Sequence, residues 1–100
     1  IIDFYKDEID INLQNDRGYT ILHCLIYYEY DGDYIKYVID VFKDKININL
    51  QDYFGDTIFH YLISYKYDVD FIKYIFNLFK DKMKPDLYNY VRGHLNDNSK

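Results

Sequence analysis

Residues 11–31 read "INLQNDRGYTILHCLIYYEYD", and residues 48–68 read "INLQDYFGDTIFHYLISYKYD". The two stretches open a longer match: at an offset of 37, residues 11–45 are identical to residues 48–82 at 21 of 35 positions. Similarity at a fixed period of this length is typical of repeat proteins, in which each unit is one supersecondary structure. We therefore interpret the chain as an array of short units.

The similarity continues on both sides of the two copies. The segment "IIDFYKDEIDI" (1–11) aligns with 38–48, and "PDLYNYVRGH" (85–94) aligns with 48–57, although Gly93 falls one place late. We therefore expect a single array over residues 1–100. Its parts are the end of a preceding repeat (1–8), two repeats (9–45 and 46–82) and the start of a truncated repeat (83–100).

Each unit contains two helical patterns. The first runs from Thr20 to about Tyr28, and the second starts after Asp33, whose carboxylate is expected to cap it as Asp70 does in the copy. A first helix of about nine residues is too short to be stable alone, so the units must stack. The expected core positions are Ile21, Leu22, Leu25, Ile26, Ile35, Val38, Ile39 and Phe42, with Ile58, Phe59, Leu62, Ile63, Ile72, Ile75, Phe76 and Phe79 in the copy.

The segment before each first helix predicts an extended stretch that enters a turn. "INLQ" is followed by a polar residue and then by Gly18 or Gly55, which can adopt a positive φ. Asn12 and Asn49, inside these stretches, are expected to form structural hydrogen bonds across the turn.

These features together resemble the ankyrin repeat. Its signature T-P-L-H-x-A is similar to "TILHCL" (20–25) and "TIFHYL" (57–62), and its turn pattern D-x-x-G is similar to "DYFG" (52–55) and "NDRG" (15–18). The resemblance implies an all-α fold: an ankyrin-type α-solenoid of helix–turn–helix repeats with short extended turn segments between them. It also implies that His23 and His60 hydrogen-bond to Thr20 and Thr57 and so fix the turn to the helix.

Several positions depart from the family pattern. Isoleucine replaces the usual proline at 21 and 58, leucine replaces alanine at 25 and 62, and lysine replaces glycine at 45 and 82. The period of 37 exceeds the usual length of about 33. Long repeats that lack alanine and are rich in Tyr and Ile resemble those of large DNA viruses, with an AT-rich protist as an equal alternative source.

Composition excludes several function classes. A net charge of −5 argues against nucleic-acid binding, which needs clustered Lys and Arg. One cysteine allows no internal disulfide and fits a reducing compartment. No apolar run reaches the roughly 18 residues of a membrane span, and no charged start followed by an apolar stretch reads as a signal peptide. We expect a protein of the cytoplasm or nucleus, or of the host cell cytoplasm if it is viral.

Catalytic and metal sites are not expected. His23, His60 and Cys24 suggest a metal site, but consecutive helical residues such as His23 and Cys24 point in different directions. Cys24 has no accompanying oxyanion-hole motif or glycine elbow that would favour a nucleophile. The acidic residues Asp31, Asp33, Asp68 and Asp70 lack the spacing of a calcium loop. We expect no enzymatic activity, no cofactor, no metal and no small-molecule substrate.

Differences between near-identical copies predict the exposed surface. The resemblance implies that the turn tips and the first-helix faces line a concave groove that binds partner proteins, and aromatic residues favour such interfaces. We therefore expect a protein–protein interaction module, directed at a host protein if the chain is viral. The alternative is a structural spacer or scaffold segment of a longer ankyrin-repeat adaptor chain. The predicted partner-binding residues are Asp16, Arg17, Tyr19, Tyr53, Phe54 and Asp56 at the tips, and Tyr27, Tyr28, Tyr61 and Tyr65 on the first helices.

Overall fold

The computed structural model describes residues 7–98, and all regular secondary structure within them is helical. The all-α class is thereby confirmed. The elements, in chain order, are α2 (Ile21–Tyr27), α3 (Gly32–Phe42), α4 (Ile58–Ser64), α5 (Val69–Phe79), the 3-10 helix η1 (Lys80–Lys82) and α6 (Pro85–Asn98).

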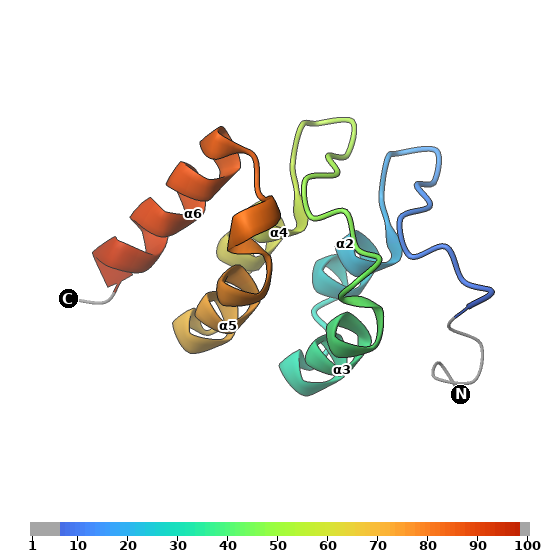
Figure 1. Ribbon diagram of the computed structural model, residues 1–100, viewed down its shortest axis with the longest axis horizontal. Helices are drawn as coiled ribbons and strands as arrows, with labels where there is room; N and C mark the ends of the chain where they lie inside the picture. Colours follow the sequence, from blue (N-terminus) through green and yellow to red (C-terminus); the bar gives the residue numbers. More distant parts are fainter. Residues whose placement is uncertain (1–6, 99–100) are drawn as a thin grey trace.

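Two helix pairs lie side by side along the longest axis of a molecule that measures 41 × 27 × 26 Å (Figure 1). Helix α2 packs directly against α4, and each is followed by its partner helix, α3 or α5. A long loop precedes each pair, and both loops project from the same side (Figure 1). We call residues 12–19 the first loop and residues 49–56 the second loop.

The first helices begin where the sequence predicts. Thr20 is the N-cap of α2, and the backbone N–H of His23 donates to its Oγ1 at 3.3 Å. In return, the backbone N–H of Thr20 donates to Nδ1 of His23 at 3.2 Å. Thr57 and His60 repeat this capping box at the start of α4. The expected threonine–histidine bonds are therefore formed in both units.

The predicted caps of the second helices are wrong by two residues. The N-cap of α3 is Asp31, whose Oδ1 accepts from the backbone N–H of Asp33 at 3.3 Å, and the N-cap of α5 is Asp68. Both aspartates of each D-x-D pair are suitable caps, and each second helix begins directly after the earlier one. Asp33 and Asp70 instead lie in the first helical turn, where a negative charge is favourable.

The predicted core of the second helices is confirmed. Ile35, Val38, Ile39 and Phe42 of α3 are all buried. Their counterparts in α5, namely Ile72, Ile75, Phe76 and Phe79, are buried as well. The helical spacing of these apolar residues produces one continuous apolar face in each unit.

Asn12 and Asn49 do form structural hydrogen bonds. These bonds reach the backbone where the next unit begins, rather than spanning the asparagines' own turns. Nδ2 of Asn12 donates to the carbonyl of Lys45 at 2.8 Å, and its Oδ1 accepts from the backbone N–H of Asn47 at 2.8 Å. Asn49 makes the same pair of bonds to Lys82 and Lys84. Each asparagine therefore links consecutive units.

The segment that follows η1 differs from the expectation. Residues 85–94 align with an extended turn, yet they lie in the helix α6. Pro85 occupies the first helical position, where its missing N–H costs nothing. Arg92 stands where the turn needs Gly55, so the positive-φ turn is disfavoured. Helix α6 buries Leu87, Val91 and Leu95 and exposes polar residues on its other side.

Candidate functional site

The first loop is a tight turn organised by Asn15. Oδ1 of Asn15 accepts from the backbone N–H groups of Arg17 at 2.9 Å and Tyr19 at 3.0 Å. Gly18 closes the turn with a φ of +82°, a conformation that glycine adopts without a steric penalty. Asp16 and Arg17 are exposed at the tip, whereas Tyr19 is half-buried.

The second loop is organised by Asp52 in the same way. One carboxylate oxygen accepts from the backbone N–H groups of Phe54 and Asp56, each at 2.9 Å. The other accepts from the hydroxyl of Tyr61 on α4, a bond that the first unit lacks because Cys24 takes the place of Tyr61. Burial works to raise the pKa of Asp52, but these hydrogen bonds, together with the nearby His23, hold that pKa below its usual value. Burial and the bond to Asp52 raise the pKa of Tyr61.

Three hydrogen bonds hold the second loop to the first unit, two of them from the first loop and one from His23 of α2. The backbone N–H of Tyr53 donates to the carbonyl of Arg17 at 3.1 Å, and Nε2 of Gln14 donates to the carbonyl of Gln51 at 2.8 Å. Nε2 of His23 lies 3.0 Å from the carbonyl oxygen of Asp56. The loops are therefore held as one rigid pair.

Two adjacent aromatic side chains project from this rigid pair. Tyr53 is 77% exposed and Phe54 is 81% exposed, the largest exposures among the exposed large apolar side chains of residues 7–98. Their backbone positions are fixed by Asp52 and by the first loop. Asp56 beside them is half-buried. Its backbone carbonyl is bonded to the N–H of Asp52 and to Nε2 of His23. The predicted exposure of Tyr53 and Phe54 is confirmed.

The four predicted tyrosines of the first helices differ in exposure. Tyr27 at the end of α2 and Tyr28 just beyond it are exposed, whereas Tyr65 just beyond α4 is half-buried. Tyr61 is only 8% exposed, so the prediction that it faces solvent is wrong. It packs between α2 and α4, with its ring edge-on to the ring of His23 at 5.1 Å. Tyr61 therefore supports the second loop from beneath and offers no surface to a partner.

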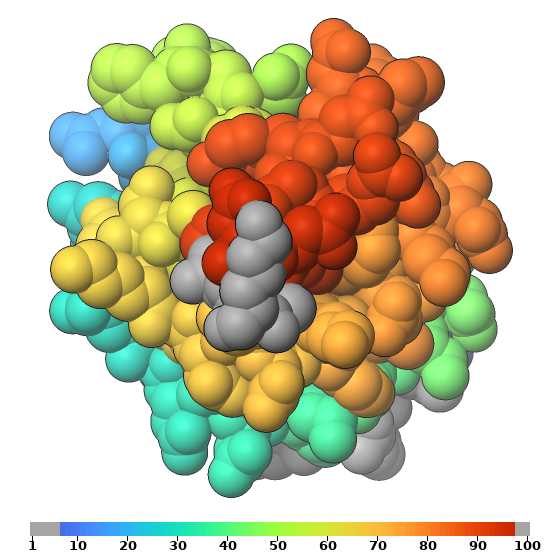
Figure 2. Space-filling model, turned by 90° about the vertical axis from the view of Figure 1, so that its left-hand side faces the viewer, coloured from blue at the N-terminus to red at the C-terminus, as the bar shows by residue number. Residues whose placement is uncertain are grey.

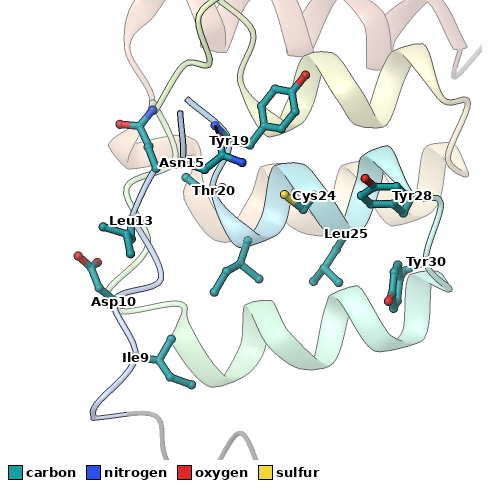
Figure 3. A pocket seen from close by; sticks show the side chains of 12 residues that line it. Ile9, Asp10, Leu13, Asn15, Tyr19, Thr20, Cys24, Leu25, Tyr28 and Tyr30 are labelled. Atoms are coloured by element: carbon teal, nitrogen blue, oxygen red, sulfur yellow. Dashed lines mark hydrogen bonds between the residues drawn. The ribbon is translucent and has the colours of Figure 1, made fainter. Parts of the chain in front are cut away.

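A different concave feature lies on the side of α2 that faces away from α4. This cavity of about 470 Å³ is mainly apolar and is bounded by Ile9, Leu13, Leu25, Tyr28 and Tyr30, with Cys24 at its wall (Figure 3). The corresponding face of α4 is covered by α2. The cavity is thus the uncovered equivalent of the interface between the two units.

Burial shifts the pKa of both His23 and Cys24 in the first unit. His23 is buried, and that burial lowers its pKa, since desolvation disfavours the charged ring. Burial likewise raises the pKa of Cys24, which disfavours the thiolate. Within residues 7–98, no three His, Cys, Asp or Glu side chains are grouped so that they could hold a metal ion.

Sequence reasoning missed the residues that organise the loops. Gln14 and Gln51 join the turns to their own glycines, and Asn15 and Asp52 accept the backbone N–H groups of each tip. The available signal was their position: the glutamines are identical in both copies, and Asn and Asp favour turns because their side chains bond to nearby backbone.

Comparisons with protein-family models, with curated proteins and with solved structures give no match. Among the described residues, no helix combines the length and the apolar character that crossing a membrane requires.

Proposed function

We propose that the chain is a protein-interaction module built as an ankyrin-type α-solenoid, and that a partner protein binds at the loop tips and the adjoining first-helix face. The observation that carries this proposal is the pair Tyr53 and Phe54, two large aromatic side chains that extend into solvent from a loop fixed by hydrogen bonds. The ankyrin assignment itself is supported by the repeated capping boxes, the glycine turns and the side-by-side helix pairs.

Physical chemistry favours these tips as a binding surface. Leaving two adjacent aromatic rings in water forgoes about 1.5–3 kcal/mol of burial free energy for each ring, which a partner would recover. Aromatic side chains lose few rotatable bonds on binding, and a loop that is already ordered adds little further entropy cost. Tyr27 adjoins the first loop, since its ring centroid lies 6.1 Å from that of Tyr19, and the ring of Tyr28 packs against Tyr27 at 5.0 Å.

The test is affinity capture from the source cell with the natural chain as bait. The double variant Tyr53→Ala, Phe54→Ala should lose the captured partner, because it removes both rings and leaves the backbone bonds of the loop in place. The matched control is Tyr34→Ala, which removes an exposed aromatic ring from α3. Circular dichroism must show equal helicity for all three proteins. Capture that survives the double substitution would remove the tips from the proposed site.

A second candidate function is a spacer within a longer stack, and the apolar cavity on α2 favours it. Another helical unit on that face would bury side chains whose counterparts are buried between α2 and α4. The test is a chain with an extra copy of residues 11–47 placed upstream. A higher melting temperature, with no partner captured by either chain, would favour the spacer over the interaction module.

A further inference from the structure

We propose that the edge of the second loop that faces away from the first loop binds an extended segment of a partner protein through backbone hydrogen bonds. The segment would lie against the second loop as the second loop lies against the first. The inference rests on the proposed interaction function and deepens it by naming the chemistry of the partner: an extended stretch that ends in a tight turn.

The precedent is the contact between the two loops. The first loop offers a carbonyl acceptor (Arg17) and a side-chain donor (Gln14), and α2 adds a second side-chain donor (His23). The second loop supplies the backbone carbonyl of Gln51, the backbone N–H of Tyr53 and the backbone carbonyl of Asp56. The backbone pattern that is bound therefore consists of a carbonyl at position i, an N–H at i+2 and a carbonyl at i+5.

The second loop presents the same three groups on its opposite edge. At the offset of 37, they are the carbonyl of Phe54, Nε2 of Gln51 and Nε2 of His60. The side chain of Gln51 bonds only to its own loop, at the carbonyl of Gly55 at 2.9 Å. Within residues 7–98, the Phe54 carbonyl and Nε2 of His60 have no hydrogen-bond partner. The three groups are thus available to a ligand.

His60 is prepared to donate. The backbone N–H of Thr57 donates to its Nδ1 at 3.0 Å, so Nδ1 carries no proton in the neutral ring and Nε2 carries one. The ring is held in place by Tyr90 of α6, which stacks on it with centroids 4.7 Å apart. The donor therefore has a fixed direction before any ligand arrives.

Space for a segment exists at this edge. A Cβ on Gly18 would meet the Cα of Asp52 at 2.9 Å, whereas a Cβ on Gly55 would meet nothing closer than the Gln51 side chain at 3.9 Å. A cavity of about 340 Å³ lies here, with Gln51, Gly55 and His60 on one side and Lys84 and Tyr90 on the other. Figure 2 shows this end of the molecule, with the yellow-green second loop and the orange-red start of α6 at its upper edge.

The occupant is a partner loop rather than a second copy of the chain. In a second copy, the first loop carries the required backbone pattern but leads directly into α2. Helix α6 already packs on α5 and places Tyr90 against His60 of α4. The α2 helix of a second copy would therefore collide with α6. A loop without a following helix at that position meets no such obstacle.

The experiment measures binding of a fluorescent head-to-tail cyclic peptide that contains "LQDYFGDT" (50–57) to the full chain by anisotropy. The matched probe is the same peptide with the nitrogen of its tyrosine methylated, which removes the N–H at position i+2 and puts a methyl group in its place. Because one hydrogen bond is lost, we expect the methylated peptide to bind about three- to tenfold more weakly. Equal binding of the two peptides, or none at millimolar concentration, would overturn the inference.

Protein variants separate this edge from the aromatic tip. Gly55→Asn tolerates a positive φ and places a side chain in the path of the segment, so peptide binding should be lost at unchanged helicity. Tyr53→Ala, Phe54→Ala should retain peptide binding, because the edge uses backbone groups, Gln51 and His60. If peptide binding fails while partner capture still depends on Tyr53 and Phe54, the inference falls and the proposed function stands. If sedimentation shows that the chain forms dimers and that Gly55→Asn abolishes them, the occupant of this edge is a second copy and not a partner loop.

Discussion

Nε2 of His23 lies 3.0 Å from the carbonyl oxygen of Asp56, so a side chain from the first helix of one unit holds the loop of the next. The same ring accepts from the backbone N–H of Thr20 at Nδ1, which leaves Nε2 protonated and able to donate. One neutral imidazole therefore caps its own helix and joins two units. The bond from Thr20 requires the neutral form of the ring, because a protonated Nδ1 could not accept it.

Stability should fall as the pH drops below about 6.5, the ordinary pKa of histidine in an unfolded chain. Burial lowers the pKa of His23 in the folded state, so the unfolded chain binds more protons between the two values. The contribution of His23 is complete above about pH 6.5 and is lost as the pH falls through its folded pKa. Urea unfolding between pH 7.5 and 5 measures the slope, and NMR titration of the His23 ring assigns it. A native ring that titrates at its ordinary value would contradict this account.

Gly18→Ala should destabilise the protein more than Gly55→Ala, by about 1–3 kcal/mol. Both glycines have φ near +80° (+82° and +84°), so both substitutions share the cost of a left-handed alanine. Only at Gly18 does the new methyl group meet backbone, the Cα of Asp52 at 2.9 Å. Chemical denaturation of the two variants measures the difference. Equal losses would show that the loops separate easily.

Ile58→Ala should cost about 2–5 kcal/mol, whereas Ile21→Ala should cost about 1 kcal/mol or less. The two residues occupy the same repeat position, yet Ile58 is 4% exposed and Ile21 is 43% exposed. The difference arises because α2 covers the face of α4. Melting curves of the two variants provide the comparison, and similar costs would indicate that the face of α2 is covered in solution.

Tyr61→Phe should destabilise the protein by about 1–3 kcal/mol, because it removes the hydrogen bond to the buried carboxylate of Asp52. The backbone N–H bonds of Phe54 and Asp56 to Asp52 remain, so the loop should keep its shape. Denaturation measures the cost, and amide exchange of the second loop reports any loosening. The control is Tyr28→Phe, an exposed ring that is 70% accessible and should change little. Identical stability of both variants would contradict a supporting role for Tyr61.

Glu29→Gly and Lys66→Gly should each stabilise the protein by about 0.5–1 kcal/mol. Both residues follow a first helix with positive φ, 57° and 59°, where glycine is unstrained. Lys73→Gly, in the interior of α5, is the control and should instead cost about 1 kcal/mol. If either of the first two substitutions lowers the denaturation midpoint, the strain at that position is absent.

Sequence reasoning succeeded where short-range chemistry decides the outcome. The capping boxes of Thr20 and Thr57, the positive-φ turns at Gly18 and Gly55, and the apolar faces of the second helices follow from residues close together in the chain. It failed at the N-cap of α3, because two aspartates two positions apart satisfy the same local rule. It also failed at residues 85–94, where homology to a turn was outweighed by Pro85 and by the missing turn glycine.

The burial of Tyr61 cannot be predicted from residues close together in the chain. Comparison of the copies marks position 61 as variable, and variability between copies predicts exposure. The two residues at this repeat position have different surroundings: Cys24 borders an open cavity, while Tyr61 lies against His23 and hydrogen-bonds to Asp52. Only the packing of one unit on the other distinguishes these environments.

The amino-acid sequence by itself determined the repeat, the helix class and the local shape of each loop, because caps, turns and periodicity act over a few residues. The tertiary structure alone decided which faces are covered. Ile21 and Ile58 share their residue type and repeat position, and their exposure differs because burial depends on what packs against a residue. The same holds for the two loop edges: the hydrogen-bonding groups recur in both units, and only the position of the neighbouring unit decides which remain free to bind.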